Sequence, residues 1–143
     1  MRGENQFRGT LGRRIPLRDS VQTQTAPRPF GHYSQAVRAG GFVFVSGQLP
    51  VQLDGKMVEG DFTKEVQQTL ANVRAIVEAA GGTLADIVQC TLYISDSSLW
   101  LEANEAYGRF FQGVPILPAR AVVPVKEMHN RARIEIQAIA QIG

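Results

Sequence analysis

The stretch that decides the fold consists of two segments, PARAVVPV at residues 118–125 and ARIEIQAIA at residues 132–140. Both segments are rich in β-branched residues, and the polar residues 126–131 connect them. This pattern predicts two strands paired as a β-hairpin. Because paired strands match apolar face to apolar face, we expect Arg120 and Glu135 on the same face of the sheet. In the symmetric register they are diagonal neighbours, roughly 7–8 Å apart between Cα atoms.

Two interpretations of this pair are open at this point. The first is a cross-strand ion pair on a solvated sheet face, an arrangement that contributes little to stability. The second is a site for a small acid, because a guanidinium holds a carboxylate in one plane and a glutamate can activate a water or transfer a proton. The pairing of the residues does not choose between the two.

The charge of the chain is unevenly distributed. Residues 1–20 hold five arginines against Glu4 and Asp19, whereas residues 21–143 hold ten basic and eleven acidic side chains, a net charge of −1. We therefore predict a basic, flexible N-terminal extension at 1–22 and a single domain at 23–143. A nucleic-acid-binding face is not expected in that domain.

Several classes of protein are not expected from the composition. No apolar run reaches membrane-spanning length and the first residues lack the apolar centre of a signal peptide, so a soluble, cytosolic protein is predicted. The single cysteine, Cys90, excludes an internal disulfide and is interpreted as a small core residue. Phosphate loops, dinucleotide turns and metal-binding cysteine motifs are missing, so no cofactor or metal is expected.

No catalytic role is predicted for Ser46 as a nucleophile or for the two histidines. Ser46 is not part of a nucleophile elbow, because Phe44 stands where that motif requires a glycine. His32 and His129 fall in bends or loops and are interpreted as incidental.

The order of predicted elements is β-β-α-β-α-β-β. Residues 62–80 form an amphipathic helix with Asp61 as N-cap, and a second helix starts near residues 96–98 and runs to about 111. We expect an α+β fold with a mixed sheet and both helices on one face. The other face would carry Arg120 and Glu135 with apolar Val122 and Ile139, which is typical of an oligomer interface. The other predicted strands are residues 33–38, 42–46 and 87–94. Residues 42–46 are a continuous apolar run, so this strand is expected to be buried on both faces. In the strand 87–94, the predicted apolar side consists of Val88, Cys90, Leu92 and Ile94.

Taken together, the motifs resemble the RidA (YjgF) family of reactive-intermediate deaminases over residues 26–142. The motifs are GHYSQ at 31–35, VSGQLP at 45–50, NVRAIVEAAG at 72–81, ADIV at 85–88, NEAY at 104–107, PAR at 118–120 and IEIQAIA at 134–140.

This resemblance implies a chorismate-mutase-like fold, a homotrimer with a central barrel, and sites in the clefts between subunits. It implies hydrolysis of 2-enamines or 2-imines of amino acids, such as 2-aminoacrylate and 2-iminobutanoate, to 2-keto acids and ammonia. The carboxylate-binding arginine falls on Arg120 and the water-activating glutamate on Glu135. Tyr33, Ser46, Gly47 and Asn104 match the remaining positions that line the cleft. Val122 stands where many members have a cysteine, so regulation through a thiol at that position is not expected.

Two other functions remain open. The same cleft could bind a keto acid without catalysis, as a sensor or regulatory protein, and this alternative also uses Arg120. The other is an RNA-directed ribonuclease, as some members of the family are described. The near-neutral domain without an aromatic and basic stripe argues against the ribonuclease.

Overall fold

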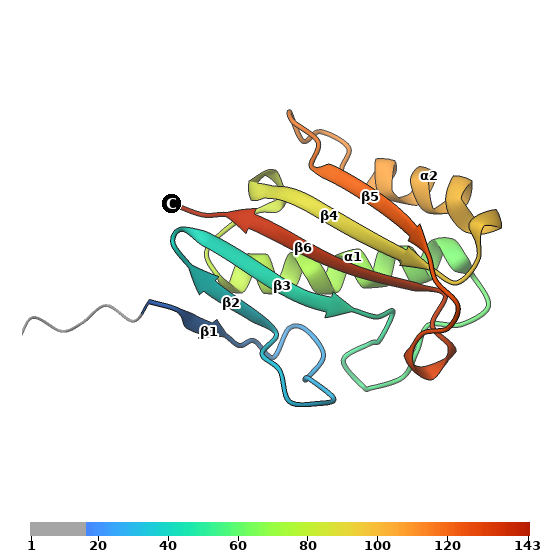
Figure 1. The fold of residues 1–143 in the computed structure, drawn as a ribbon, viewed down its shortest axis with the longest axis horizontal. Coiled ribbons are helices and arrows are strands. Elements are labelled where there is room, and N and C mark those ends of the chain that lie inside the picture. The colour runs from blue at the N-terminus through green and yellow to red at the C-terminus, as the bar shows by residue number, and fades with distance from the viewer. Residues whose placement is uncertain (1–16) are drawn as a thin grey trace, which may run out of the picture.

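The computed structural model describes residues 17–143, in which one mixed sheet of six strands packs against two α-helices (Figure 1). The strand order is β1-β2-β3-β6-β4-β5, and every neighbouring pair is antiparallel except β4 and β5. The predicted α+β class with a mixed sheet is confirmed. The strands are β1 (Asp19–Val21), β2 (Ala36–Ala39), β3 (Phe42–Gln48), β4 (Ile87–Ile94), β5 (Ala119–Pro124) and β6 (Ile134–Gln141). The helices are α1 (Phe62–Ala79) and α2 (Trp100–Phe110), with short 3-10 turns at Leu84–Asp86, Ser97–Leu99 and His129–Arg131.

Both helices lie on the same face of the sheet, where the core forms (Figure 1). Alternate residues of β6 (Ile134, Ile136, Ala138 and Ala140) are buried on this face. Burying one such isoleucine side chain contributes roughly 1.5–3 kcal/mol. Helix α1 begins at the predicted cap, where the Asp61 carboxylate accepts a hydrogen bond from the Lys64 amide at 3.0 Å.

The predicted hairpin between the last two strands is wrong. Strand β4 lies between them: β6 pairs with β3 and β4, whereas β5 is an edge strand that runs parallel to β4. The segment that connects β5 to β6 passes the end of β4. Two hydrogen bonds show this: the Val125 amide donates to the Ile94 carbonyl (2.8 Å), and the Ser95 amide donates to the Arg133 carbonyl (3.1 Å). Placing β6 in the centre pairs both of its edges and buries its apolar face, which a terminal hairpin would not do.

The changed pairing places Arg120 and Glu135 on opposite faces of the sheet. Arg120 is the partner of Cys90, whose side chain is buried under the helices. Glu135 is the partner of Tyr93 on the face that the helices do not cover. Val122, two residues after Arg120 in β5, faces the helices as well and packs against the core. The prediction that Arg120, Val122 and Glu135 share the uncovered face is therefore wrong.

Two predictions about strand faces also fail. The register of β4 against β6 shifts between Ile87 and Gln89, so Ile87 enters the core and Val88 is 41% exposed, contrary to its predicted apolar side. In β3, Val43 is buried but Phe44 is 45% exposed, because the helices cover one face only. Apolar side chains therefore lie open on the uncovered face of the isolated chain, among them Phe42, Phe44, Val88 and Val123.

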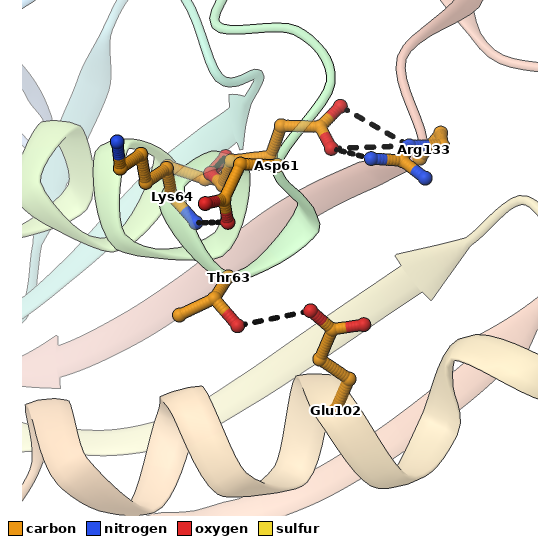
Figure 2. Close-up of polar contacts among 7 residues, drawn as sticks. Asp61, Thr63, Lys64, Glu102 and Arg133 are labelled. Carbon is orange, nitrogen blue, oxygen red and sulfur yellow. Dashed lines mark hydrogen bonds and ion pairs between the residues drawn. The ribbon is translucent and has the colours of Figure 1, made fainter.

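An ion pair anchors the chain that leads into β6. The guanidinium of Arg133 donates to both carboxylate oxygens of the buried Glu65 in α1, and it lies 5.2 Å from the centre of the Phe62 ring. Figure 2 shows Arg133 beside the start of α1, where Thr63 also donates to Glu102 of α2 at 3.0 Å. Because Glu65 is buried, loss of Arg133 would leave its carboxylate without a partner, which is destabilising. This contact holds the start of β6, two residues before Glu135.

The N-terminal part of the sheet begins earlier than predicted. Residues 1–16 of the predicted extension lie outside the described residues, whereas β1, at residues 19–21, pairs with β2. The sheet thus includes part of the stretch assigned to the extension. Within residues 17–143, neither helix has the combination of length and apolar character needed to cross a membrane.

Candidate active site

Four of the predicted site residues line one pocket at the edge of the uncovered sheet face. Tyr33, Ser46, Gly47 and Glu135 lie around a space of about 490 Å³, which we call the glutamate pocket. They come from the segment before β2, from the end of β3 and from the start of β6. Because β3 and β6 are neighbouring strands, residues far apart in the sequence meet here.

The end of β3 is shaped so that the Glu135 side chain fits against it. The register with β6 is irregular between Val45 and Gln48. The Ser46 hydroxyl donates to the Ser34 carbonyl at 2.6 Å, which holds this end of β3 to the preceding segment. A Cβ atom on Gly47 would collide with Oε1 of Glu135. Only a glycine at this position leaves room for the carboxylate.

One wall of the pocket is formed by the segment before β2, within residues 27–35. The side chain of Gln35 is buried, accepts a hydrogen bond from the Thr23 amide (2.7 Å), and donates to the carbonyls of Thr23 (3.1 Å) and Pro27 (2.9 Å). The hydroxyl of Tyr33 accepts a hydrogen bond from the Phe30 amide at 3.1 Å. Gln35 thus positions this wall. Its motif was noted in the sequence, but its role follows only from these contacts.

The carboxylate of Glu135 is half-buried, and burial raises its pKa above 4.5, the ordinary value for glutamate. The charge of His129, which lines the same pocket, acts in the opposite direction and lowers the pKa of Glu135. A carboxylate with a raised pKa is a stronger base than an ordinary one. His129 was interpreted as incidental from the sequence, because nothing in its spacing indicates that its turn folds over the pocket.

The other two predicted site residues form a second group, which we call the arginine cluster, on the helix side of β5. The guanidinium of Arg120 donates to Oδ1 of Asn104 in α2 at 2.9 Å. It lies over the rings of Tyr107, 4.8 Å from the ring centre, and Trp100, at 5.8 Å. Tyr107 and Trp100 were not predicted as site residues, although both lie within the predicted second helix. These contacts orient the guanidinium and leave N–H donors for a ligand.

Beneath the arginine cluster lies the single cysteine. Cys90 is fully buried, as predicted, and burial raises the pKa of its thiol to about 11. A thiol with so high a pKa is a poor nucleophile. Val122 is the second residue after Arg120 and is half-buried against the core. The chemistry available at this cluster is therefore that of the guanidinium and not of a thiol.

The glutamate pocket and the arginine cluster are separate in one chain. Within residues 17–143, no ion pair joins Arg120 to Glu135; the two ion pairs found there are Arg133–Glu65 and Arg74–Glu78. The interpretation as a cross-strand ion pair is thus wrong. The site for a small acid does not form within one chain in the predicted way either, because the two groups face opposite sides of the sheet.

We predict that Gly47→Ala displaces the Glu135 carboxylate and removes any activity that depends on it. The added Cβ would meet the flexible end of Glu135 and not the backbone, so the protein should still fold. The measurement is the rate of the imino-acid hydrolysis that the motif resemblance implies, together with the melting temperature. We expect a loss of about 10²-fold or more in kcat, the order of an acid–base contribution.

Gly108→Ala is the matched control for this change. Gly108 is on the exposed side of α2, and no atom lies within 4 Å of its would-be Cβ. Alanine there should keep full activity and raise stability by about 0.5–1 kcal/mol through helix propensity. If Gly47→Ala retained full activity, the carboxylate would not need the position it occupies beside β3.

The comparisons with known proteins agree with the motifs. A family model described as Endoribonuclease L-PSP matches residues 23–142. A RutC family protein of Aquifex aeolicus is 45% identical over 121 residues, covering 84% of this chain and 96% of that protein. A protein of Dermatophagoides farinae named 2-iminobutanoate/2-iminopropanoate deaminase is 37% identical over 123 residues, covering 85% of this chain and 94% of that protein.

Similarity in three dimensions is equally extensive. The crystal structure of the E. coli YjgF gene product superposes with a TM-score of 0.82 at 37% identity, covering 86% of this chain and 98% of that one. The sheet with its helices on one face is therefore the α+β fold of the RidA/YjgF structures. The chain belongs to the Endoribonuclease L-PSP family, the RidA (YjgF) family that its motifs resemble.

Proposed function

We propose that this protein is a hydrolytic deaminase that converts 2-enamines and 2-imines of amino acids to 2-keto acids and ammonia. The observation that carries the proposal is the half-buried carboxylate of Glu135, held beside Gly47 in a pocket and with a raised pKa. Family membership supports it, as does the name of the Dermatophagoides farinae relative. The reaction needs only water and proton transfers, so no cofactor is part of the proposal.

The active site is proposed to form between subunits of a homotrimer. The glutamate pocket and the arginine cluster face opposite sides of the sheet, so a second copy is needed to bring Arg120 to the pocket. Exposed Phe42, Phe44 and Val123 on the uncovered face support burial against another copy. In a closed ring each subunit gives its pocket to one neighbour and its arginine to the other.

Arg120 is assigned the carboxylate of the substrate. Its planar guanidinium can hold both carboxylate oxygens at once, which fixes the plane of the adjacent C=N bond. The contacts to Asn104, Tyr107 and Trp100 hold the guanidinium before the substrate arrives. Less side-chain freedom is then lost on binding.

Glu135 is assigned the proton transfers. It removes a proton from water as the water oxygen bonds to the carbon of the protonated imine, which forms a carbinolamine and leaves Glu135 protonated. Glu135 then returns this proton to the amine nitrogen. The C–N bond breaks with its electrons on the departing ammonia, and the hydroxyl proton is released as the carbonyl forms. The raised pKa suits both steps, because the group must accept and then give up a proton near neutral pH.

The first test is an assay with 2-aminoacrylate or 2-iminobutanoate generated in situ by a dehydratase or an amino-acid oxidase. The wild-type protein should accelerate release of the keto acid. Binding of keto acids without any acceleration would instead establish the non-catalytic alternative. The mass in solution, from sedimentation or light scattering, should be three times the 15.7 kDa of one chain; a monomer would contradict the shared site.

The second test asks whether the two halves of a site come from different subunits. Arg120→Ala and Glu135→Gln subunits, each inactive alone, are refolded together in equal amounts. In a ring assembled at random, about a quarter of the sites receive an intact pocket and an intact arginine, so about a quarter of the wild-type rate should return. No recovery in demonstrably mixed trimers would mean that both residues act within one subunit.

A further inference from the structure

We propose that His129 is a second acid–base group of the glutamate pocket, and that it donates the proton that converts a bound enamine into the imine. This inference rests on the proposed function and extends it to the tautomer on which the enzyme acts. With His129 the enzyme converts enamines directly. Without His129 it hydrolyses only imines that have already formed in solution.

The placement of His129 is the first observation. Its side chain lines the glutamate pocket together with Glu135 and is exposed at its rim. Its ring lies against that of Phe30, with ring centres 6.1 Å apart and planes tilted by 41°. The Phe30 amide in turn donates to the Tyr33 hydroxyl. One side of the pocket is thus a connected wall of Tyr33, Phe30 and His129.

The turn that carries His129 has an unusual backbone conformation. Asn130 (φ 53°) and Arg131 (φ 57°) both lie in the left-handed region, which is unfavourable for residues with a Cβ atom. The Ala132 amide closes the turn by donating to the His129 carbonyl at 3.1 Å. The next residue, Arg133, is anchored to Glu65 of α1. The turn is therefore fixed on its C-terminal side, and it presents the imidazole to the pocket and not to bulk solvent alone.

The chemistry of an enamine requires a second group. Its C3 carbon must gain a proton before water can attack C2, while Glu135 must be deprotonated to activate that water. The other charged or titratable groups lining the pocket are Arg28 and Tyr33. Arginine does not release its proton in proteins, and a phenol is a weaker acid than an imidazolium. Histidine is the side-chain type that exchanges a proton near neutral pH. The influence of the His129 charge on the pKa of Glu135 indicates that the two groups are electrostatically coupled.

The proton balance closes over one turnover. The His129 imidazolium gives its proton to C3, where the C=C electron pair forms the new C–H bond while the nitrogen lone pair forms the C=N bond of the iminium, and His129 becomes neutral. Glu135 takes a proton from water during attack at C2 and passes it to the nitrogen. The C–N bond breaks with its electrons on the departing ammonia, and the hydroxyl proton released as the carbonyl forms returns to His129. The sum is enamine plus water to keto acid plus ammonia.

The test uses stereochemistry at C3, which a purely structural role would not affect. A threonine dehydratase generates 2-aminobut-2-enoate in D₂O, and lactate dehydrogenase with NADH traps the 2-oxobutanoate before its label exchanges. A fixed donor on one face of the enamine delivers deuterium with one configuration. The wild type should therefore give an excess of one C3 configuration. His129→Gln should lose this excess and consume the enamine at least about tenfold more slowly.

A second arm supplies 2-iminobutanoate from an amino-acid oxidase, and here His129→Gln should stay within about twofold of the wild type. His32→Gln is the matched control, since His32 is the other histidine and is not among the residues that line the pocket; it should be normal in both arms. Retention of the configuration by His129→Gln, or equal losses in both arms, would overturn the proposal. A wild type inactive in both arms would overturn the proposed function itself.

Discussion

Glu135→Gln is expected to lower kcat for imino-acid hydrolysis by about 10²–10⁴-fold, the range that a positioned general base contributes. Glutamine keeps the shape of the side chain beside Gly47 but cannot take a proton from water. Binding of a product keto acid, measured by calorimetry, should survive because Arg120 supplies that contact. A fall in kcat without a comparable loss of product binding is the signature of a group that acts in the transition state.

The pH dependence follows from the same residue. Burial raises the pKa of Glu135, so the reactive carboxylate form is lost at a higher pH than for an ordinary glutamate. The acid limb of kcat/KM should therefore fall with decreasing pH around a midpoint above 4.5, the ordinary value for glutamate. Replacing His129 removes a charge that lowers this pKa, so the midpoint should move upward in His129→Gln. A fully active Glu135→Gln with an unchanged pH profile would mean that another group positions the water.

Arg120→Ala is expected to reduce kcat/KM by about 30- to 5,000-fold, corresponding to about 2–5 kcal/mol for truncating one partner of a charged, hydrogen-bonded pair. The loss should appear in the binding of the substrate and of product keto acids, because the carboxylate loses both donors of the guanidinium. Arg120→Lys should recover little of it. An ammonium group is a point charge and cannot hold a carboxylate in one plane.

Arg109→Ala provides the control for the removal of a positive charge. Arg109 is an exposed residue in the last turn of α2, the helix that also carries Asn104. The Arg109→Ala protein should keep wild-type kinetics, apart from a small effect of its overall charge on association with the anionic substrate. If Arg109→Ala and Arg120→Ala weakened keto-acid binding equally, the arginine cluster would act only through its general positive field.

Local elements of this protein could be predicted from the sequence because each depends on residues close together in the chain. The amphipathic helix α1 with its Asp61 cap, the strand 87–94 and the strand within residues 132–140 all recur in the structure. The motifs containing Tyr33, Ser46, Gly47 and Glu135 also indicated residues that do line one pocket. Periodicity and capping act over a few residues, so one sequence is enough to show them.

The placement of the last two strands was decided by the tertiary structure. Sequence proximity favoured a hairpin, but inserting β6 between β3 and β4 pairs both of its edges, and its apolar face is then completely buried. Neighbour preference along the chain is weaker than the burial of a whole strand face. That insertion moved Arg120 to the helix side, separated it from Glu135, and carried the turn with His129 over the glutamate pocket. The sequence by itself indicated Arg120, Glu135 and the other motif residues as candidates, but not His129. Only the packing of strands distant in the chain decided which of them face one another, because that packing depends on the burial available to the whole sheet.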